Sequence, residues 1–205
     1  MHLNWLGQTC VKLQTKNLDE DVNILIDGYR PKTGDFPRSF SPQLALYSKG
    51  MENAATLSQN PFVIDSLGEF EIKNVMVYAV PGNEENIIYK ISAEGLTIVH
   101  LGRIKKAPEN GDLEKILGPD ILLIPVGDGQ NYLEPKAAAA LANALEPRII
   151  IPIAHKCDTD PDAKPITNFI TELGLKPETT EKKLIIKKKD LPQEETKLIV
   201  LEKEY

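Results

Sequence analysis

Residues 120–153 read DILLIPVGDGQNYLEPKAAAALANALEPRIIIPI, and the fold class follows from this stretch. Asp120–Val126 and Arg148–Ile153 are nearly continuous apolar runs, which are typical of strands buried on both faces. Between them, Pro135 suits a first helical position and apolar residues follow it at helical spacing: Ala137, Ala140, Leu141, Ala144 and Leu145. The stretch therefore predicts a helix over Glu134–Leu145 inside a βαβ unit with parallel strands.

Working outward, most of the chain reads as short strands separated by Gly, Asn or Pro. We expect strands at His2–Leu6, Thr9–Gln14, Val22–Asp27, Leu44–Tyr47, Phe62–Asp65, Phe70–Val80, Ile87–Ser92, Leu96–Leu101, Lys183–Lys189 and Lys197–Lys203. Within Phe70–Val80 the alternation slips at Lys73-Asn74, which indicates a bulge or a turn. Shorter helices are expected at Glu52–Ser58, Asp112–Leu117 and Pro165–Leu173. This mixture predicts an α/β layered fold, with no linker dividing residues 1–205 into domains.

Composition excludes several functional classes. The chain has 205 residues and a formal net charge of −6, which argues against general nucleic-acid binding. No apolar run is long enough for a membrane helix, and the start of the chain does not resemble a secretion signal. The two cysteines, Cys10 and Cys157, are expected to be reduced thiols in a cytoplasmic protein.

An ordered series of motifs resembles the metallo-β-lactamase fold, and in particular small bacterial zinc-dependent hydrolases related to its lactonase branch. The motifs are Asn4–Cys10 (NWLGQTC), Ile24–Asp27 (ILID), Gly68–Lys73 (GEFEIK), His100-Leu101-Gly102, Ile121–Gly127, Glu146–Pro152 and Lys187–Thr196. The resemblance extends from Met1 to about Glu202 and implies a four-layer αββα sandwich. It also implies one or two zinc ions, which would convert bound water into a hydroxide nucleophile.

The ligand positions that the resemblance implies carry other residues in this chain. The main cluster, His-x-His-x-Asp-His, falls on Lys49, Met51, Asn53 and Ala54. Arg103 occupies the place of the bridging Asp, Ala154 occupies that of the last His, and the short loop 82–86 contains no His. Lysine is a poor ligand unless it is deprotonated, and two cations would repel a divalent ion. We therefore predict no catalytic residues, no bound metal and no other cofactor.

Other residues keep alternative chemistries open. His155, Cys157, Asp158 and Asp160 form an H-x-C-D-x-D cluster that could rebuild a metal site for hydrolysis of an ester, lactone or phosphoester, although it could also be a plain polar loop. Cys10 or Cys157 could act as a nucleophile if His155 or His100 activated it. His100 itself, which ends an apolar strand, is expected to be a hydrogen-bonded structural residue.

Lys49 and Arg103 would converge on one cleft in this fold. They could hold a carboxylate or phosphate there, or they could simply bridge to acidic neighbours such as Asp27 and Asp65. The candidate anion-binding cleft comprises Lys49, Asn53, Arg103 and His155. The sequence thus favours a pseudoenzyme that serves as a binding or assembly module, with a small anionic ligand as its partner. A homo-oligomer and pairing with an active relative are further expectations.

Overall fold

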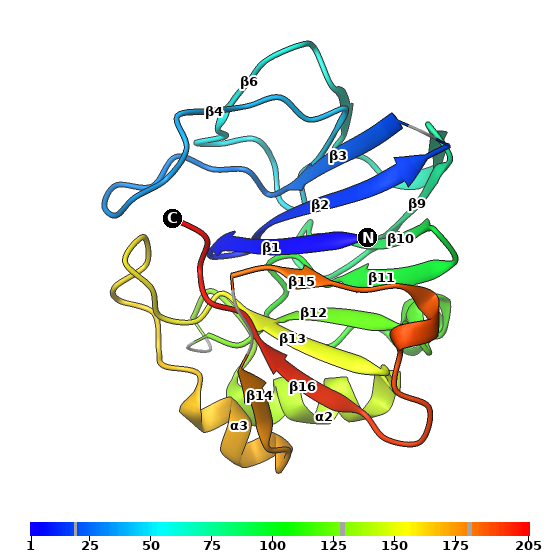
Figure 1. Cartoon of the computed structure of the whole chain (residues 1–205). Coiled ribbons are helices and arrows are strands. Elements are labelled where there is room, and N and C mark those ends of the chain that lie inside the picture. Colours follow the sequence, from blue (N-terminus) through cyan, green and yellow to red (C-terminus); the bar gives the residue numbers. More distant parts are fainter. Residues whose placement is uncertain (19, 128–129, 180–181) are drawn as a thin grey trace.

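The computed structural model describes residues 1–18, 20–127, 130–179 and 182–205. Two sheets face one another at its centre (Figure 1). The six-stranded sheet has the order β15-β1-β2-β3-β5-β7. Its strands are β1 (His2–Gly7), β2 (Cys10–Asn17), β3 (Glu20–Ile26), β5 (Leu44–Leu46), β7 (Phe62–Ile64) and β15 (Leu184–Ile185). β15, β1, β2 and β3 are antiparallel neighbours, whereas β3, β5 and β7 run parallel.

The eight-stranded sheet has the order β14-β16-β13-β12-β11-β10-β9-β8. Its strands are β8 (Gly68–Ile72), β9 (Val75–Pro81), β10 (Ile87–Ala93), β11 (Leu96–His100), β12 (Ile121–Pro125), β13 (Ile149–Ile153), β14 (Pro177–Thr179) and β16 (Lys197–Val200). β12 and β13 pair in parallel, with Ile121 opposite Ile149, which confirms the predicted βαβ unit. At the other end of the eight-stranded sheet, β8, β9 and β10 form an antiparallel meander.

The main core lies between the two sheets. Ile24 and Ile26 of β3 point into it together with Tyr89 and Ile91 of β10, while Leu25 faces the other side of its sheet. This alternation is the period of two that a strand imposes on its side chains. A second core lies on the outer face of the eight-stranded sheet, beneath the helices.

The helices on that outer face are α1 (Asn110–Leu113), the 3₁₀ turn η1 (Glu114–Ile116), α2 (Pro135–Leu145) and α3 (Thr167–Leu173). The predicted stripe of α2 is wrong for Ala137, Ala140 and Ala144, which are exposed. The buried residues are Ala138, Ala139, Leu141, Ala142 and Leu145. Alanines lie on every side of α2, so in its sequence only the two leucines mark the buried face. None of the helices in the described ranges is long and apolar enough to cross a membrane.

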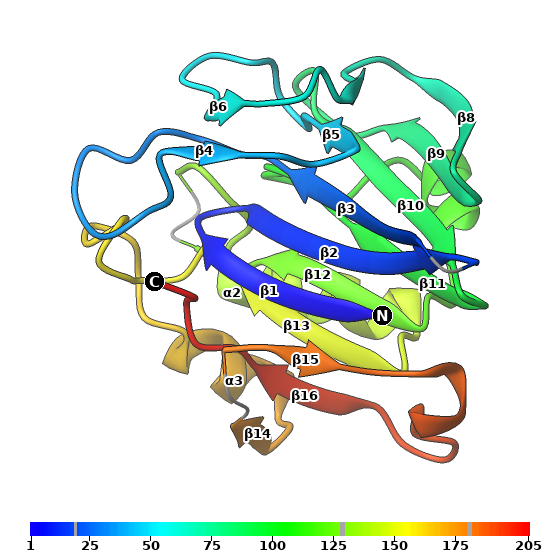
Figure 2. The same ribbon diagram turned by 45° about the horizontal axis from the view of Figure 1, so that its top comes forward.

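The outer face of the six-stranded sheet has a different cover. Residues 28–43 and a small parallel sheet of β4 (Ser39–Phe40) and β6 (Thr56–Leu57) pack there, with Phe36, Phe40 and Leu57 against Leu6 and Leu25. In Figures 1 and 2, β4 and β6 lie at the opposite end of the molecule from α2 and α3. The metallo-β-lactamase-like α/β sandwich is thus confirmed, but loops and short strands form its fourth layer in the described residues.

The expected helix at Glu52–Ser58 is wrong for a local reason. Asn53 has φ 59° and Gln59 and Asn60 have φ 69° and 46°, so left-handed residues interrupt any helix there. Ala54 instead forms a β-bridge with Tyr29. The predicted strand Lys183–Lys189 also shortens to β15, because the 3₁₀ turn η2 (Lys188–Asp190) follows it.

The phase slip in Phe70–Val80 corresponds to a hairpin between β8 and β9. Lys73 and Asn74 have φ 51° and 65°, the two positive values of a tight hairpin turn. The predicted turn is therefore confirmed.

Candidate functional site

Several strands end at the same edge of the sandwich. Asp27 follows β3, Ser48 follows β5, and residues 101–105 follow β11. In open α/β sheets, ligands bind beside such carboxyl ends. The turn between β1 and β2 reaches the same edge, because the Ala154 N–H after β13 donates to the Gln8 carbonyl at 2.8 Å.

A buried centre lies beneath this edge and comprises Cys10, Asp27, Ser48, Asn86 and His100. Asp27 is 5% exposed. One carboxylate oxygen accepts from the Ser48 N–H at 2.6 Å, and the other accepts from the Ser48 hydroxyl at 2.7 Å. Lys49 and Arg103 make no ion pair with Asp27 or Asp65 in the described structure. Bridging to these two carboxylates is therefore not observed, but Lys49 does pair with another acidic neighbour, Glu84, at 3.9 Å.

His100 is fully buried and uses both ring nitrogens. Nδ1 accepts from the Gly102 N–H at 3.0 Å, so the proton resides on Nε2, which donates to the Thr9 carbonyl at 2.9 Å. Burial lowers the pKa of His100, although the charge of Asp27 and the hydrogen bond to the Thr9 carbonyl oppose the shift. The structural role predicted for His100 is confirmed.

The described residues place no activating base in hydrogen-bond contact with either cysteine. Cys10 is fully buried, and burial, followed by the charge of Asp27, raises the pKa of its thiol well above the ordinary value. Cys157 contacts the Thr159 hydroxyl at 3.3 Å. Neither thiol hydrogen-bonds to His100 or His155 within the described ranges, so the nucleophile hypothesis has no geometric support here.

Asn86 connects the buried centre to Arg103. Its side-chain N–H donates to the Leu101 carbonyl at 3.0 Å, and its Oδ1 accepts from the Arg103 N–H at 2.6 Å. Gly102 lies between them in close contact, since a Cβ built there would lie 2.5 Å from the Ser48 Cβ. This packing fixes the backbone from which the Arg103 side chain projects.

Above the buried centre lies a cationic cleft with two lobes. Lobe one, a cavity of about 510 Å³, is lined by Lys49, Arg103 and Lys105. Lobe two, of about 420 Å³, is lined by Arg30, Lys32, Asn53 and again Arg103. Both lobes share Gln8, Arg103, Asp160 and Asp162. Among the lining residues that the structure describes, five are Lys or Arg and three are Asp or Glu.

Only part of the charge in this cleft is compensated. Lys49 and Lys105 share one carboxylate, Glu84, at 3.9 and 3.5 Å. Arg30 donates to the Thr56 hydroxyl at 3.1 Å. Within the described ranges, no carboxylate lies at ion-pair distance from Arg103.

The structure therefore places three of the four candidate residues, Lys49, Asn53 and Arg103, along one cleft. His155 is not among its lining residues. It is 8% exposed and stacks on Trp5 with ring centroids 4.1 Å apart. Its buried Nε2 has no hydrogen-bond partner in the described structure, and burial lowers the pKa of His155 to about 4.

The rest of the H-x-C-D-x-D cluster does not converge with His155 either. Asp158 forms an ion pair with Lys203 at 2.8 Å and accepts from the Asp35 N–H at 2.9 Å. Burial is the largest single effect and opposes ionisation of Asp158, but the hydrogen bonds from Lys203 and from the Asp35 and Thr159 N–H groups, together with the charge of Lys203, lower its pKa. The described parts of the chain contain no group of three or more His, Cys, Asp or Glu side chains placed to hold a metal ion.

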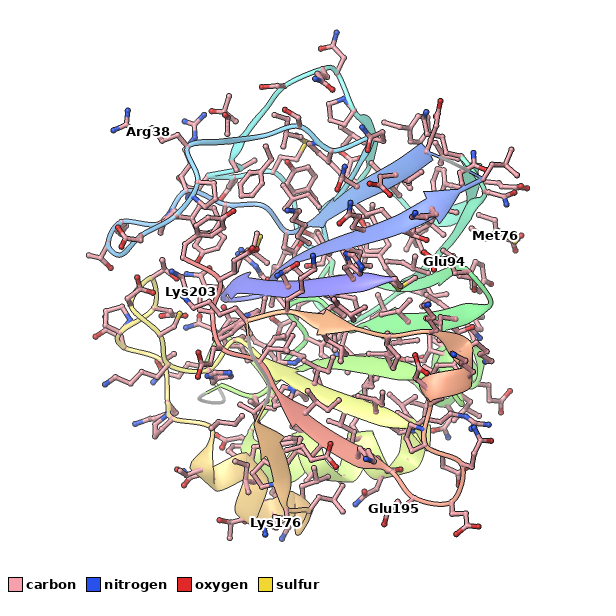
Figure 3. The ribbon with its side chains drawn as sticks, viewed as in Figure 1. Arg38, Met76, Glu94, Lys176, Glu195 and Lys203 are labelled. Carbon is pink, nitrogen blue, oxygen red and sulfur yellow. The ribbon has the colours of Figure 1, made fainter. Side chains whose placement is uncertain are left out.

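Lys203 joins three segments of the molecule. Besides the ion pair with Asp158, it donates to the Asp35 carbonyl at 2.7 Å, although it is only 9% exposed. Figure 3 shows Lys203 where the C-terminal segment meets these two loops. The Thr33 hydroxyl adds a bond to the Asp158 carbonyl at 3.2 Å. The loops that line lobe two are thus cross-linked on their outer side.

Sequence reasoning missed Arg30, Lys32, Lys105 and Glu84. Arg30, Lys32 and Lys105 follow the ends of β3 and β11 by a few residues, and this position was the available signal. Glu84 lies in the short loop between β9 and β10, and its partners are distant in sequence. Pairing of that kind leaves no local pattern.

Comparisons with known proteins agree on one fold. The family described as the β-lactamase superfamily domain matches residues 2–154. A candidate Zn-dependent hydrolase of the metallo-β-lactamase superfamily from Thermotoga maritima superposes with a TM-score of 0.81 over 98% of both chains, at 24% identity. Among curated proteins, no sequence matches significantly.

Two further solved structures share the architecture at lower identity. Igni18, a metallo hydrolase from Ignicoccus hospitalis, has a TM-score of 0.63 and 15% identity, over 84% of this chain and 90% of its own. YhfI of Bacillus subtilis, a metallo-β-lactamase fold protein, has a TM-score of 0.61 and 6% identity, over 100% and 97%. At these identities the likeness establishes the fold alone.

Proposed function

We infer the function from one premise: the chain belongs to the β-lactamase superfamily. We propose that it is a pseudoenzyme of this superfamily, which binds a small anion in the cationic cleft and catalyses no metal-dependent hydrolysis. The observation that carries the proposal is the position of Arg103. It lies in both lobes of the cleft, and no described carboxylate neutralises it.

The residues present do not fit the zinc ions of the superfamily. Lys49, Met51, Asn53 and Ala54 stand at the implied ligand positions, and Met51 is 46% exposed. The nearby donors are already used, because Asp27 accepts two bonds from Ser48 and both nitrogens of His100 have partners. Cationic Lys49 and Arg103 would repel a divalent ion, by roughly 4 kcal/mol per unit-charge pair at 4 Å under intermediate screening.

The same charges favour an anion. Arginine presents a planar set of donors that matches carboxylate and phosphate oxygens, and lysine adds a compact charge. The chain carries a net charge of −6, yet cations predominate among the described residues of the cleft. A concave site of one sign focuses the electrostatic potential and raises the local concentration of oppositely charged ligands.

Thermal denaturation with and without millimolar inorganic phosphate tests the anion site. Phosphate should raise the melting temperature of the parent, because a ligand of the native state stabilises it by mass action. Lys49→Met with Arg103→Leu should abolish the rise. Lys197→Met with Arg38→Leu is the matched control, since Lys197 is 39% exposed and ion-paired, as Lys49 is at 37%, and Arg38 is exposed outside the cleft. An equal response of the Lys49 and Arg103 double variant would overturn the site.

A gain of binding gives a second, independent readout. Glu84 is the only carboxylate in the described ranges that pairs with Lys49 and Lys105, so Glu84→Gln should release both cations and tighten phosphate binding by calorimetry. Misfolding cannot produce this gain. Unchanged or weaker binding would contradict the role given to these lysines.

Elemental analysis addresses the hydrolase alternative. After equilibration with zinc and manganese, the protein should hold well under one metal ion per chain, and generic esters and phosphoesters should not turn over faster with metal. Stoichiometric metal, lost together with activity in His155→Ala, would overturn the pseudoenzyme proposal in favour of a hydrolase.

A further inference from the structure

The geometry points to a ligand with two separated anionic groups joined by a hydroxylated spacer, one anionic group in each lobe of the cationic cleft. This inference rests on the proposed function and specifies the class of its ligand. Each lobe has cations of its own, Lys49 and Lys105 in lobe one and Arg30 and Lys32 in lobe two, while Arg103 serves both.

Backbone hydrogen bonds join the segments that line lobe two. The Arg30 N–H donates to the Asn53 carbonyl at 2.8 Å, and the Ala55 N–H donates to the Gly28 carbonyl at 3.0 Å. These bonds join the segments that follow β3 and β5, so Arg30 and Asn53 are fixed relative to one another. The Arg30 guanidinium donates to the neutral Thr56 hydroxyl, which leaves its charge for a ligand.

The junction between the lobes has a different character. Asp160 and Asp162 line both lobes beside Gln8 and Arg103. Carboxylates repel an anion but accept hydrogen bonds from hydroxyl groups, and the Gln8 side chain carries both a donor and an acceptor. Cations therefore lie towards both ends of the cleft, with Glu52 also present in lobe two, and the two Asp side chains lie at the junction, which matches two anionic ends and a neutral polar spacer.

The size of the cleft agrees with this ligand class. Lobes of about 510 and 420 Å³ each fall within the range of small-molecule sites, roughly 300–1,000 Å³. One inorganic anion would leave the second lobe filled with water. A ligand that reaches both lobes makes its second contact intramolecularly, so its affinity exceeds that of either end alone.

Calorimetry with three probes tests the inference: inorganic phosphate, fructose 6-phosphate and fructose 1,6-bisphosphate. We expect the bisphosphate to bind at least about tenfold more tightly than either probe with a single phosphate group, as linked contacts do. Arg30→Gln with Lys32→Gln should remove this advantage, so that the bisphosphate binds no more tightly than fructose 6-phosphate, while inorganic phosphate keeps its site in lobe one. Arg38→Gln with Lys197→Gln, which changes the same charge outside the cleft, should preserve it.

The outcomes separate the two proposals. If inorganic phosphate binds but the bisphosphate binds no more tightly, the two-lobe inference is overturned and the anion site stands. Equal weakening of all three probes by Arg30→Gln with Lys32→Gln also overturns it, because the lobes would not act separately. If none of the probes binds, the proposed function fails as well.

Discussion

The buried centre and the cationic cleft are built from neighbouring residues but differ in burial, in hydrogen bonding and in charge. Ser48 is fully buried and bonded to Asp27, whereas Lys49, the next residue, lies in the cleft with its side chain 37% exposed. Gly102 likewise packs against residues of the buried centre, whereas the next residue, Arg103, lines the cleft. Polar groups in the centre are largely hydrogen-bonded within the fold, whereas Arg103 in the cleft has no carboxylate at ion-pair distance in the described ranges. The boundary between the interior and the proposed binding surface therefore falls at single peptide bonds.

The largest expected effect comes from Asp27. Asp27→Ala removes two hydrogen bonds to a buried carboxylate and leaves the Ser48 N–H without a partner, so the free energy of unfolding should fall by about 3–5 kcal/mol. Asp162→Ala, the same change at an exposed residue of the cleft, should stay within about 0.5 kcal/mol. Urea denaturation measures both, and equal effects would erase the distinction between the two regions.

His155 should behave as a member of the buried interior. Its pKa falls from 6.5 to about 4 on folding, so the unfolded chain binds the proton more tightly. The free energy of unfolding therefore has its full value above pH 6.5 and decreases by about 3 kcal/mol as the pH falls towards 4. His155→Phe, which keeps a ring against Trp5, should flatten the pH dependence measured by denaturation. An unchanged pH profile would place His155 in solvent.

Two glycines give the finest test of the comparison. Gly102 and Gly50 share φ +65°, but a Cβ on Gly102 would lie 2.6 Å from Asn86 Oδ1, whereas no described heavy atom lies within 4 Å of one on Gly50. Gly50→Ala should cost about 1 kcal/mol through backbone strain. Gly102→Ala should cost about 2 kcal/mol more through crowding. Similar melting temperatures for the two variants would show that the centre is loosely packed.

Sequence reasoning worked where burial leaves a pattern. The runs at Asp120–Val126 and Arg148–Ile153 predicted parallel strands, because only strands covered on both faces are so uniformly apolar. It was wrong where composition is ambiguous, as in the alanines of α2, and where left-handed residues such as Asn53 interrupt a helix. The strands β4 and β6, of two residues each, form because they pair with each other, and no local sequence pattern indicates that pairing.

The residues of the candidate site also divide into those that the sequence could predict and those that it could not. Lys49, Asn53 and Arg103 were predictable because strand ends converge whatever their side chains are. His155 was misplaced because Ala154 has φ 60°, a turn of the backbone that directs the next side chain towards Trp5. The second lobe and Glu84 depend on contacts between distant segments. Those contacts emerge only when the chain is folded.

Lys203 gives the cleft a mechanical property. This one side chain holds Asp158 and the Asp35 carbonyl, so the loops that carry Arg30 and Asp160 cannot separate without breaking its bonds. The three segments should then open as one cooperative unit in native-state hydrogen exchange. A ligand in the cleft would slow exchange near Lys203 as well, although Lys203 is not among the lining residues. Occupancy of the cleft could thus reach the C-terminal segment through a buried lysine that does not line the cleft.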